Sequence, residues 1–251
     1  MIEKKIDELA VKVYETREIM GAEAAREAAE CILACLEKKE TINCIFAAAP
    51  SQNEFLKELV SDKRIPWNRI NGFHMDEYVG LPVKDSRSFS GYLSSVVFDK
   101  VPFRSVHLLN GMAETEEETR RYSQLLEENP TDIVFMGVGE NGHIAFNDPS
   151  AADFQDKSLV KEVVLEEVCR RQQVNDGCFP ELKAVPKKAL TVTVPGLMRS
   201  AHVFCIVPNE RKAEAVKRML TGAISEDCPA SILRRKQGAK LYLDQDSAAF
   251  L

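Results

Sequence analysis

Short apolar runs alternate with helical patterns along most of the chain, and this alternation limits the possible folds more than any other feature. The runs are rich in Val, Ile and Phe, as is typical of strands buried on both faces. The predicted strands are residues 42–49, 69–75, 105–109, 132–138, 189–194, 202–208 and 240–243. The predicted helices between them are residues 52–62, 86–99, 114–128 and 209–221. We therefore expect an α/β fold: a single doubly wound, mostly parallel, Rossmann-like sheet with helices on both faces.

The amino-terminal region is expected to be helical. Residues 3–19 and 22–38 have helical patterns that are separated near Met20 and Gly21. The opening stretch MIEKKIDELAVKVYE is charged and periodic, which favours a mature helix over a signal peptide. No linker divides the 251 residues convincingly, so residues 1–251 are expected to form one domain.

Charge and cysteine content exclude several classes of function. The formal net charge is −6, and no run of Lys and Arg is present, which argues against nucleic acid and anionic membranes as partners. No apolar run approaches the length of a membrane span. The seven cysteines are irregularly spaced and form no CxxC pair. We expect them to be reduced, in a cytoplasmic protein without a zinc site.

Four polar stretches directly follow predicted strands. In a doubly wound sheet, ligands bind beyond the carboxyl ends of the strands. The stretches are APSQNE (49–54), HMDEYVGLP (74–82), GENGHIAFNDP (139–149) and PNERK (208–212). The fold alone therefore predicts that they surround one crevice.

The stretch GENGHIAFNDP predicts an acid–base site in a glycine-rich turn. Gly139 and Gly142 permit unusual backbone angles and the close approach of a ligand. His143 can accept or donate a proton near neutral pH, and Asp148 is close enough in sequence to orient it. A turn with a hydrogen-bonded structural histidine is an equally good interpretation of these residues alone.

The stretch HMDEYVGLP places two acids, Asp76 and Glu77, directly after a strand. One carboxylate can point into the crevice, where it could remove a proton from a carbon next to a carbonyl, while its neighbour points away. The alternative is an ordinary charged loop. A metal site built from His74, Asp76 and His143 lacks a dedicated ligand spacing, so no metal is expected.

The other two stretches predict helix starts. Ser51 and Glu54 form a capping-box pattern. Asn209 is a candidate N-cap, and Arg211 and Lys212 then fall in the first helical turn, where the helix dipole disfavours cations. Two cations at that end suggest a bound anion, although solvated surface charge is the alternative.

Together these stretches resemble the glucosamine-6-phosphate deaminase (isomerase) family, which shares a fold with the 6-phosphogluconolactonases. The resemblance covers nearly the whole chain and is densest at FHMDEYVGLP and GENGHIAFNDP, followed by VNDGCF, VPKKALTVTV and PNERKAEAV. Lactonases usually have arginine after the DE pair and threonine after the GH pair. This chain has Tyr78 and Ile144 at those positions, which implies the deaminase branch.

The resemblance implies a reaction and its residues. An amino sugar 6-phosphate and water would give fructose 6-phosphate and ammonia, without a metal or redox cofactor. Asp76 would be the enolising carboxylate and His143 the ring-opening base, assisted by Asn141 and Asp148. The substrate-binding residues would be Lys212, Ser51, Gln52, Glu77, Gly139, Gly142, Arg170 and Arg171.

Departures from the family pattern leave other functions open. Asn141 and Asp148 stand where the family usually has aspartate and glutamate, which weakens the charge behind His143. The phosphate loop of the family is replaced by AAAPSQN, and a phosphate-binding arginine is replaced by Cys178. Arg170 or Arg171 is expected to take the place of that arginine. The alternatives are a related isomerase or lactonase with another substrate, or a non-catalytic sugar-phosphate sensor. Because the chain stops soon after KLYL, we expect a small, non-allosteric form, either a monomer or a homo-oligomer.

Overall fold

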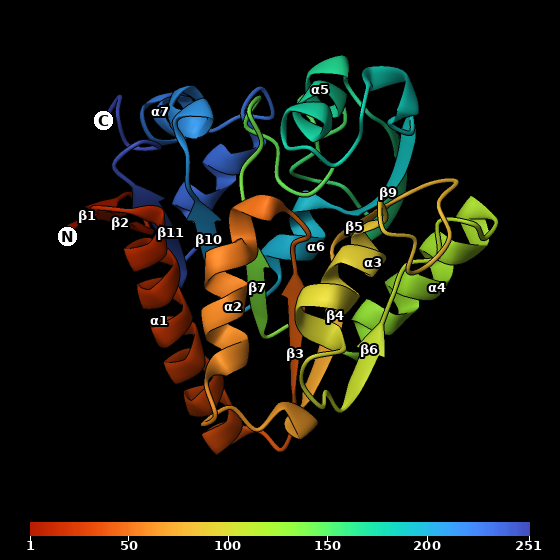
Figure 1. The fold of residues 1–251 in the computed structure, drawn as a ribbon, viewed down its shortest axis with the longest axis horizontal. Helices are drawn as coiled ribbons and strands as arrows, with labels where there is room; N and C mark the ends of the chain where they lie inside the picture. Colours follow the sequence, from red (N-terminus) through yellow and green to blue (C-terminus); the bar gives the residue numbers. More distant parts are fainter.

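The computed structural model describes residues 1–251 and contains one large central sheet (Figure 1). Its eight strands are β1 (Ile2–Ile6), β2 (Leu9–Tyr14), β3 (Ile42–Phe46), β4 (Ile70–His74), β6 (Ser105–His107), β7 (Ile133–Met136), β10 (His202–Val207) and β11 (Ala239–Asp244). They lie in the order β1-β2-β11-β10-β7-β3-β4-β6. All neighbouring pairs are parallel except β1 with β2. The predicted α/β fold with a mostly parallel sheet is confirmed.

Helices cover both faces of this sheet. They are α1 (Arg17–Lys38), α2 (Asn53–Ser61), α3 (Phe89–Leu93), α4 (Thr115–Glu128), α5 (Glu167–Asn175), α6 (Val194–Met198) and α7 (Ala213–Thr221). A π-helix, Ser94–Phe98, continues α3, and a 3-10 helix, Glu210–Lys212, precedes α7. None of the helices has the length and apolar character needed to cross a bilayer.

The core has two parts because side chains along each strand alternate between the faces. In β10, Phe204 and Ile206 pack in a cluster with residues of α1, α2 and α3, the helices that lie in front of the sheet in Figure 1. Val203 and Cys205 point to the other face and pack with residues of α4, α6 and α7. Burial on both sides explains why the strands read as continuous apolar runs.

The prediction of a helix over residues 3–19 is wrong. Residues 2–14 form the antiparallel hairpin β1–β2, which turns at Asp7 with a left-handed φ of 51° and extends the sheet beyond β11. The helix α1 starts only at Arg17, where Thr16 accepts a hydrogen bond from the Ile19 N–H as N-cap. Gly21 lies inside this helix because a side chain there would collide with Glu54 of α2.

A second, smaller sheet is present in addition to the single sheet expected from the sequence. It consists of β5 (Asp76–Tyr78), β8 (Val160–Val164) and β9 (Lys188–Val192), antiparallel and in the order β5-β9-β8. The predicted strand 189–194 is therefore a strand of this small sheet. β5 and β8 were not predicted. This sheet lies next to the carboxyl ends of the main strands and carries part of the site described below.

Candidate active site

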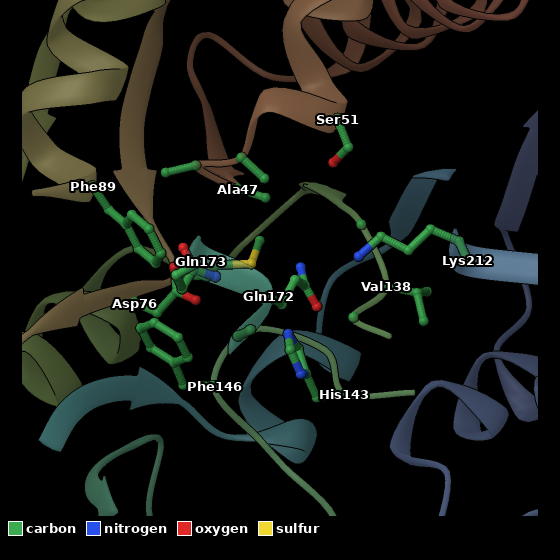
Figure 2. Close-up of a pocket in the computed structure, with 16 residues that line it drawn as sticks. Ala47, Ser51, Asp76, Phe89, Val138, His143, Phe146, Gln172, Gln173 and Lys212 are labelled. Atoms are coloured by element: carbon green, nitrogen blue, oxygen red, sulfur yellow. The ribbon is translucent and has the colours of Figure 1, made fainter. Parts of the chain in front are cut away.

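The four polar stretches converge on one pocket at the carboxyl ends of β3, β4, β7 and β10, as the fold predicted. Ser51, Asp76, His143 and Lys212 line it, one from each stretch. Figure 2 shows Asp76 and Lys212 on opposite sides, with the Lys212 ammonium directed inward, Ser51 above and His143 below. The site therefore combines a carboxylate, an imidazole and a cation around one small cavity.

Asp76 and Glu77 point in opposite directions because they are consecutive residues of a strand. Asp76 lines the pocket. Glu77 turns into the protein, where its carboxylate accepts hydrogen bonds from the backbone N–H groups of Tyr78, Phe89 and Ser90 at 2.9, 3.0 and 2.8 Å. Glu77 thus anchors the start of α3 and does not reach the ligand space, contrary to its assignment as a substrate-binding residue.

The environment of Asp76 makes it a stronger base than an ordinary aspartate. Its side chain is only 6% exposed and has no hydrogen-bond partner in the protein. Burial, and then the negative charge of Glu77, raise the pKa of Asp76 well above its usual range. A carboxylate with a raised pKa is better matched to removing a proton from carbon near neutral pH.

His143 is held in one tautomer by its neighbours. Its Nδ1 lies 2.8 Å from Asn141 Oδ1 and 3.1 Å from Asp148 Oδ1. The Asn141 Oδ1 also accepts from the His143 backbone N–H, while Asn141 Nδ2 donates to Asp148 and to Glu166. Both oxygens near Nδ1 are therefore acceptors, so Nδ1 carries the proton. In the neutral ring, Nε2 has a free lone pair for a ligand.

Asp148 stays ionised inside this network. It is fully buried, which opposes the charged form, but hydrogen bonds from His143, Asn141 and the backbone N–H of Glu166 outweigh burial and lower the pKa of Asp148. A negative charge therefore remains behind His143 even though Asn141 is neutral. Such a charge stabilises the imidazolium that forms when the ring accepts a proton.

Gly139 is required by the position of the His143 ring. A Cβ atom at residue 139 would lie 2.1–2.3 Å from three atoms of the imidazole. Gly142 has a left-handed φ of 88°, and a Cβ there would lie 2.7 Å from Cys228 Sγ. Gly139 also lines the pocket, whereas Gly142 shapes the turn behind it. These glycines allow the backbone to wrap closely around the histidine.

Strand β9 fixes the two acid–base elements relative to one another. Its Thr191 is paired with Asp76 in the small sheet, and the Thr191 hydroxyl accepts a hydrogen bond from the Phe146 backbone N–H at 3.1 Å. The next carbonyl, of Val192, accepts from the side chain of Asn147 at 2.9 Å. One strand thus holds both the Asp76 strand and the loop that carries His143.

Lys212 is a buried cation without an anionic partner. It is 6% exposed, and no carboxylate lies within 4 Å of its ammonium. Burial lowers the pKa of Lys212, partly offset by the more distant Asp176 and Glu140. Its neighbour Arg211 instead forms an ion pair with Asp176 at 3.2 Å. Of the two cations predicted to attract an anion, only Lys212 faces the pocket, and it leaves a place for one negative group of a ligand.

The predicted helix starts are present with different caps. Asn209 accepts a hydrogen bond from the Arg211 N–H at 3.0 Å, as expected of an N-cap. The capping box of Ser51 and Glu54 does not form, because Glu54 pairs with Arg17 at 2.6 Å and α2 has no side-chain cap. Ser51 is thus left at the rim of the pocket.

The sequence of this chain matches a known protein family. A family model described as glucosamine-6-phosphate isomerases/6-phosphogluconolactonase matches residues 15–242. The chain belongs to this family. It is 36% identical over 185 residues to glucosamine-6-phosphate deaminase of Bacillus cereus strain B4264, an alignment that covers 73% of this chain and 69% of the relative. The corresponding protein of Bacillus thuringiensis strain Al Hakam is equally similar over the same shares.

Solved structures from both branches of the glucosamine-6-phosphate isomerase/6-phosphogluconolactonase family share the fold. A monomeric glucosamine-6-phosphate deaminase superposes with a TM-score of 0.85 and 32% identity, covering 96% of this chain and 99% of the other. A 6-phosphogluconolactonase from Thermotoga maritima superposes with a TM-score of 0.76 and 20% identity, covering 94% and 99%. The second likeness concerns the fold alone.

The two arginines that were expected to bind the substrate, Arg170 and Arg171, point away from the pocket. Arg170 donates to the backbone carbonyls of Leu182 and Val185, and Arg171 is exposed and paired with Glu167. Neither lines the pocket, so neither replaces the arginine that the family resemblance places at position 178. Cys178 itself lines an adjoining hollow.

Gln52 is fully buried behind the pocket wall. It donates to the carbonyl of Ile206 and to Ser51 Oγ. It therefore supports the loop that carries Ser51 and does not contact the ligand space.

Two pocket residues, Gln172 and Gln173, were missed. They lie on α5, which was not predicted as an element. The Gln172 side chain accepts from the Glu140 N–H, whereas the Gln173 side chain has no hydrogen bond within the protein although the residue is only 7% exposed. The signal was present: Cys169 and Gln173 are four apart, so an unusual polar residue continues the buried side of a helical pattern.

The metal site considered for His74, Asp76 and His143 does not assemble. His74 is completely buried, lies outside the pocket, and has no hydrogen bond from either ring nitrogen. Asp148 and Cys169 do lie near His143, with ligand atoms within 4.8 Å of one another. However, Asp148 and the Nδ1 of His143 already bond to each other there, so this group is the support of the histidine.

Proposed function

We propose that this protein is a glucosamine-6-phosphate deaminase that acts on glucosamine 6-phosphate or a close relative such as galactosamine 6-phosphate. The observation that carries the proposal is the placement of Asp76, His143 and Lys212 around one pocket. A raised-pKa carboxylate, an imidazole with its Nε2 free and an unpaired cation are the three groups that isomerisation of an aminoaldose phosphate requires.

Lys212 binds the phosphate of the substrate. Its ammonium is inside the pocket and lacks a counter-ion, so a phosphate oxygen would replace water there with a charge-assisted hydrogen bond. Ser51, on the same rim, offers a hydroxyl to the same group. The sugar chain then extends toward Asp76 on the opposite side.

His143 opens the sugar ring. Its Nε2 removes the proton of the ring C1 hydroxyl, and the C1–O5 bond breaks to give the aldehyde, with a proton delivered to O5. The imidazolium formed during this transfer is stabilised by Asp148, whose low pKa keeps it negative. The Asn141 oxygen keeps the ring in the tautomer that makes Nε2 the base.

Asp76 carries out the enolisation. Its carboxylate removes the C2 proton of the open aldose, and the electron pair moves to form the enol between C1 and C2. A proton returned to C1 produces the C1 alcohol and leaves an imine at C2. Addition of water to that imine releases ammonia and gives fructose 6-phosphate, so no electrons are exchanged with a cofactor.

Gln173 recognises the hydroxyl groups of the sugar. The residue is 7% exposed and lines the pocket, and its side-chain amide has no partner in the protein, which makes a bound hydroxyl its natural hydrogen-bond partner. The residue shares the Asp76 side of the pocket in Figure 2. Gln173 thus offers polar contacts to the substrate, which the thiol at Cys178, in place of the family's arginine, does not.

Tyr78 favours the deaminase branch over the lactonase branch. Its ring is fully buried and packs against Phe89, Phe146 and Phe179 at centroid distances of 4.8, 5.3 and 5.4 Å. The arginine usual in lactonases would place a charge in this aromatic cluster. Support also comes from the named relatives, which are deaminases at 36% identity.

The test is a coupled assay of purified protein with glucosamine 6-phosphate, in which ammonia and fructose 6-phosphate are followed together. Equal amounts of both products are expected. Galactosamine 6-phosphate, glucose 6-phosphate and 6-phosphogluconolactone are tested in parallel. Hydrolysis of the lactone without ammonia release would assign a lactonase, and tight binding of sugar phosphates without C2 proton exchange would assign a sensor.

The cysteines and the composition of the pocket also bear on the compartment, the domain organisation and the oligomeric state of the enzyme. All seven cysteines are free thiols, which fits a reducing compartment such as the cytoplasm. The residues that line the pocket come from many elements between residues 47 and 212, so residues 1–251 act as one catalytic domain. Each chain contains a whole set of the proposed groups, and a monomer would suffice for the chemistry.

A further inference from the structure

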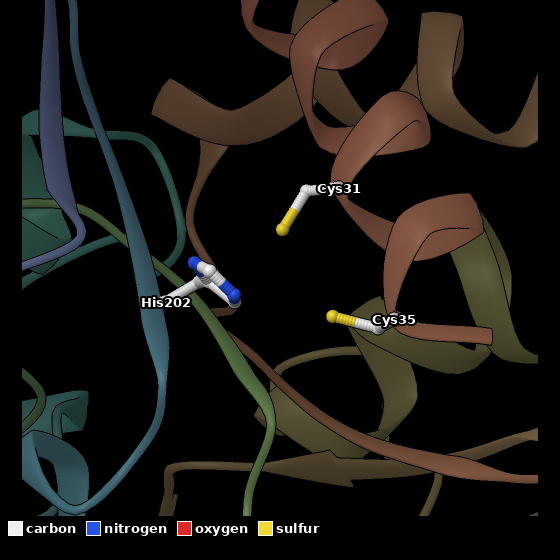
Figure 3. Close-up of side chains that lie close together, drawn as sticks. All are labelled: Cys31, Cys35 and His202. Atoms are coloured by element: carbon white, nitrogen blue, oxygen red, sulfur yellow. The ribbon is translucent and has the colours of Figure 1, made fainter. Parts of the chain in front are cut away.

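Three metal-binding side chains gather at the opposite end of the sheet from the pocket. Cys31 and Cys35 lie one turn apart on α1, and His202 is the first residue of β10. The two sulfur atoms and a ring nitrogen of His202 all lie within 4.8 Å of one another. Figure 3 shows both thiols directed from the helix toward the imidazole. Residues that are 167 or more positions apart in sequence are thus brought together by the packing of α1 on the sheet.

The three groups are not committed to other partners. Both cysteines are free thiols whose side-chain hydrogen bond is to each other, and no side-chain hydrogen bond holds the His202 ring. All three side chains are half-buried, so they are sheltered yet open to an ion from solution. A neutral imidazole can offer a ring nitrogen to a metal ion, and histidine is the commonest metal ligand in proteins.

We propose that Cys31, Cys35 and His202 form a binding site for Zn²⁺, with a water molecule as the fourth ligand. Two thiolates and one imidazole are the donors that zinc prefers, and a tetrahedral ion requires ligands that converge as these do. Oxygen-seeking ions such as Mg²⁺ and Ca²⁺ would find no carboxylate among these three side chains. The irregular cysteine spacing gave no such indication, since the histidine comes from a distant strand.

The surrounding charges are compatible with a zinc ion. Two thiolates neutralise its charge, so burial of the complex adds no net charge to the protein. The nearby Lys240 ammonium is already bound to Glu27 at 2.7 Å. The Asp132 carboxylate is held by Lys39 at 2.5 Å and by the Asn43 backbone N–H at 2.9 Å. Asp132 is therefore committed elsewhere, which leaves the fourth position to water.

Binding has a structural consequence. The ion would tie α1 to β10, and it would do so at the amino end of that strand, away from the pocket at its carboxyl end. A free thiol is protonated at neutral pH, because the ordinary pKa of cysteine is about 8.5. Zinc binding must therefore release about two protons per chain. Because only the folded chain forms the site, zinc should raise the melting temperature.

The test uses the full-length protein, stripped of metal under reducing conditions and then titrated with Zn²⁺ against a chromophoric chelator. We expect about one ion per chain. Cobalt in place of zinc should give the intense visible bands of a tetrahedral thiolate complex. Cys31→Ser, Cys35→Ser and His202→Asn should each weaken binding by more than about tenfold. Cys178→Ser, a half-buried thiol elsewhere, is the matched control and should bind as the wild type does.

A second measurement avoids any folding defect of the variants. In the wild-type protein, zinc should slow alkylation of Cys31 and Cys35 and leave that of Cys178 unchanged, as mapped by mass spectrometry. Equal metal affinity in the wild type and the Cys31→Ser/Cys35→Ser double variant would overturn the proposal. So would alkylation rates at Cys31 and Cys35 that do not respond to zinc.

Discussion

The side-chain oxygen of Asn141 lies 2.8 Å from Nδ1 of His143, and the Asn141 amide nitrogen donates to two carboxylates, those of Asp148 and Glu166. An aspartate at position 141 would put a carboxylate oxygen where the donating amide nitrogen now faces the carboxylates of Asp148 and Glu166. In the sequence, Asn141 stands where the family usually has an aspartate, and it lacks the negative charge of that residue. In the fold, it is the residue that fits between Asp148 and Glu166.

Asn141→Asp should therefore be harmful although it restores the usual family residue. Loss of two donated hydrogen bonds and a new like charge should lower the free energy of unfolding by about 1–3 kcal/mol, as measured by urea unfolding at pH 7. Adding Glu166→Gln supplies an amide that can donate to the new carboxylate at position 141 and accept from the Ser150 N–H, so the double variant should recover most of the loss. Glu167→Gln, on the next residue and exposed, is the control and should give no recovery.

Asp76→Asn should abolish exchange of the C2 proton of glucosamine 6-phosphate, with turnover reduced by at least about 100-fold. The amide is similar in shape but is not a base, so ligand binding should be nearly unchanged. The measurements are solvent deuterium exchange followed by NMR and binding by calorimetry. Exchange at the wild-type rate would remove Asp76 from the mechanism.

The raised pKa of Asp76 also predicts a pH profile. A base must be ionised to act, and burial together with Glu77 shifts that ionisation to higher pH. The rate kcat/KM should therefore decline on the acid side at a pH well above the ordinary range of an aspartate. If the acid limb lay in that ordinary range, the essential base would have to be a different or a solvated group.

Lys212→Met should weaken the binding of phosphorylated sugars and at the same time stabilise the ligand-free protein. A phosphorylated sugar should bind more weakly by about 1.5–3 kcal/mol, whereas the unphosphorylated sugar should be little affected. The free energy of unfolding without ligand should rise, since an unpaired buried cation is replaced by an apolar chain of similar length. Lys57→Met, an exposed lysine of α2, should change neither quantity. Equal losses for both sugars would show that Lys212 does not hold the phosphate.

His74 predicts how stability depends on acid. Burial lowers the pKa of His74 from 6.5 to about 3, so the unfolded chain binds a proton that the folded chain does not. Stability should therefore fall as the pH drops from 6.5 toward 3, by about 1.4 kcal/mol per unit from this residue. His74→Leu should reduce that slope in denaturant unfolding and should leave stability at pH 8 equal or higher. An unchanged acid slope would contradict the assignment.

The sequence predicted the main sheet well because its strands are buried on both faces and its helices have clear periods. It failed where elements are short or lie at an edge. β1 is exposed along most of its length, and the charged residues of IEKKI concealed its pairing with LAVKVY. The convergence of Asp76, His143 and Lys212 followed from the rule that strand ends share one edge of a sheet.

The sequence could not show which polar side chains near the pocket are held by other groups of the protein. Glu77, Arg170 and Arg171 are polar and close in sequence to the pocket, yet each is held by neighbours outside it. Gln173 carries no charge and belongs to no obvious motif, and it still faces the ligand space. The local sequence shows which chemical groups a residue carries. The direction of its side chain depends on which neighbouring groups of the folded protein it bonds to.

The pleat of β5 decides which of two adjacent acids meets the ligand. The pairing of Asp76 with Thr191 and of Glu77 with Leu190 sets that choice. A slip of one residue between β5 and β9 would exchange the two side chains, turning the longer acid into the pocket and the shorter one into the loop at α3. An insertion or deletion in β9, more than a hundred residues from Asp76, would thus replace the proposed base without altering either acid.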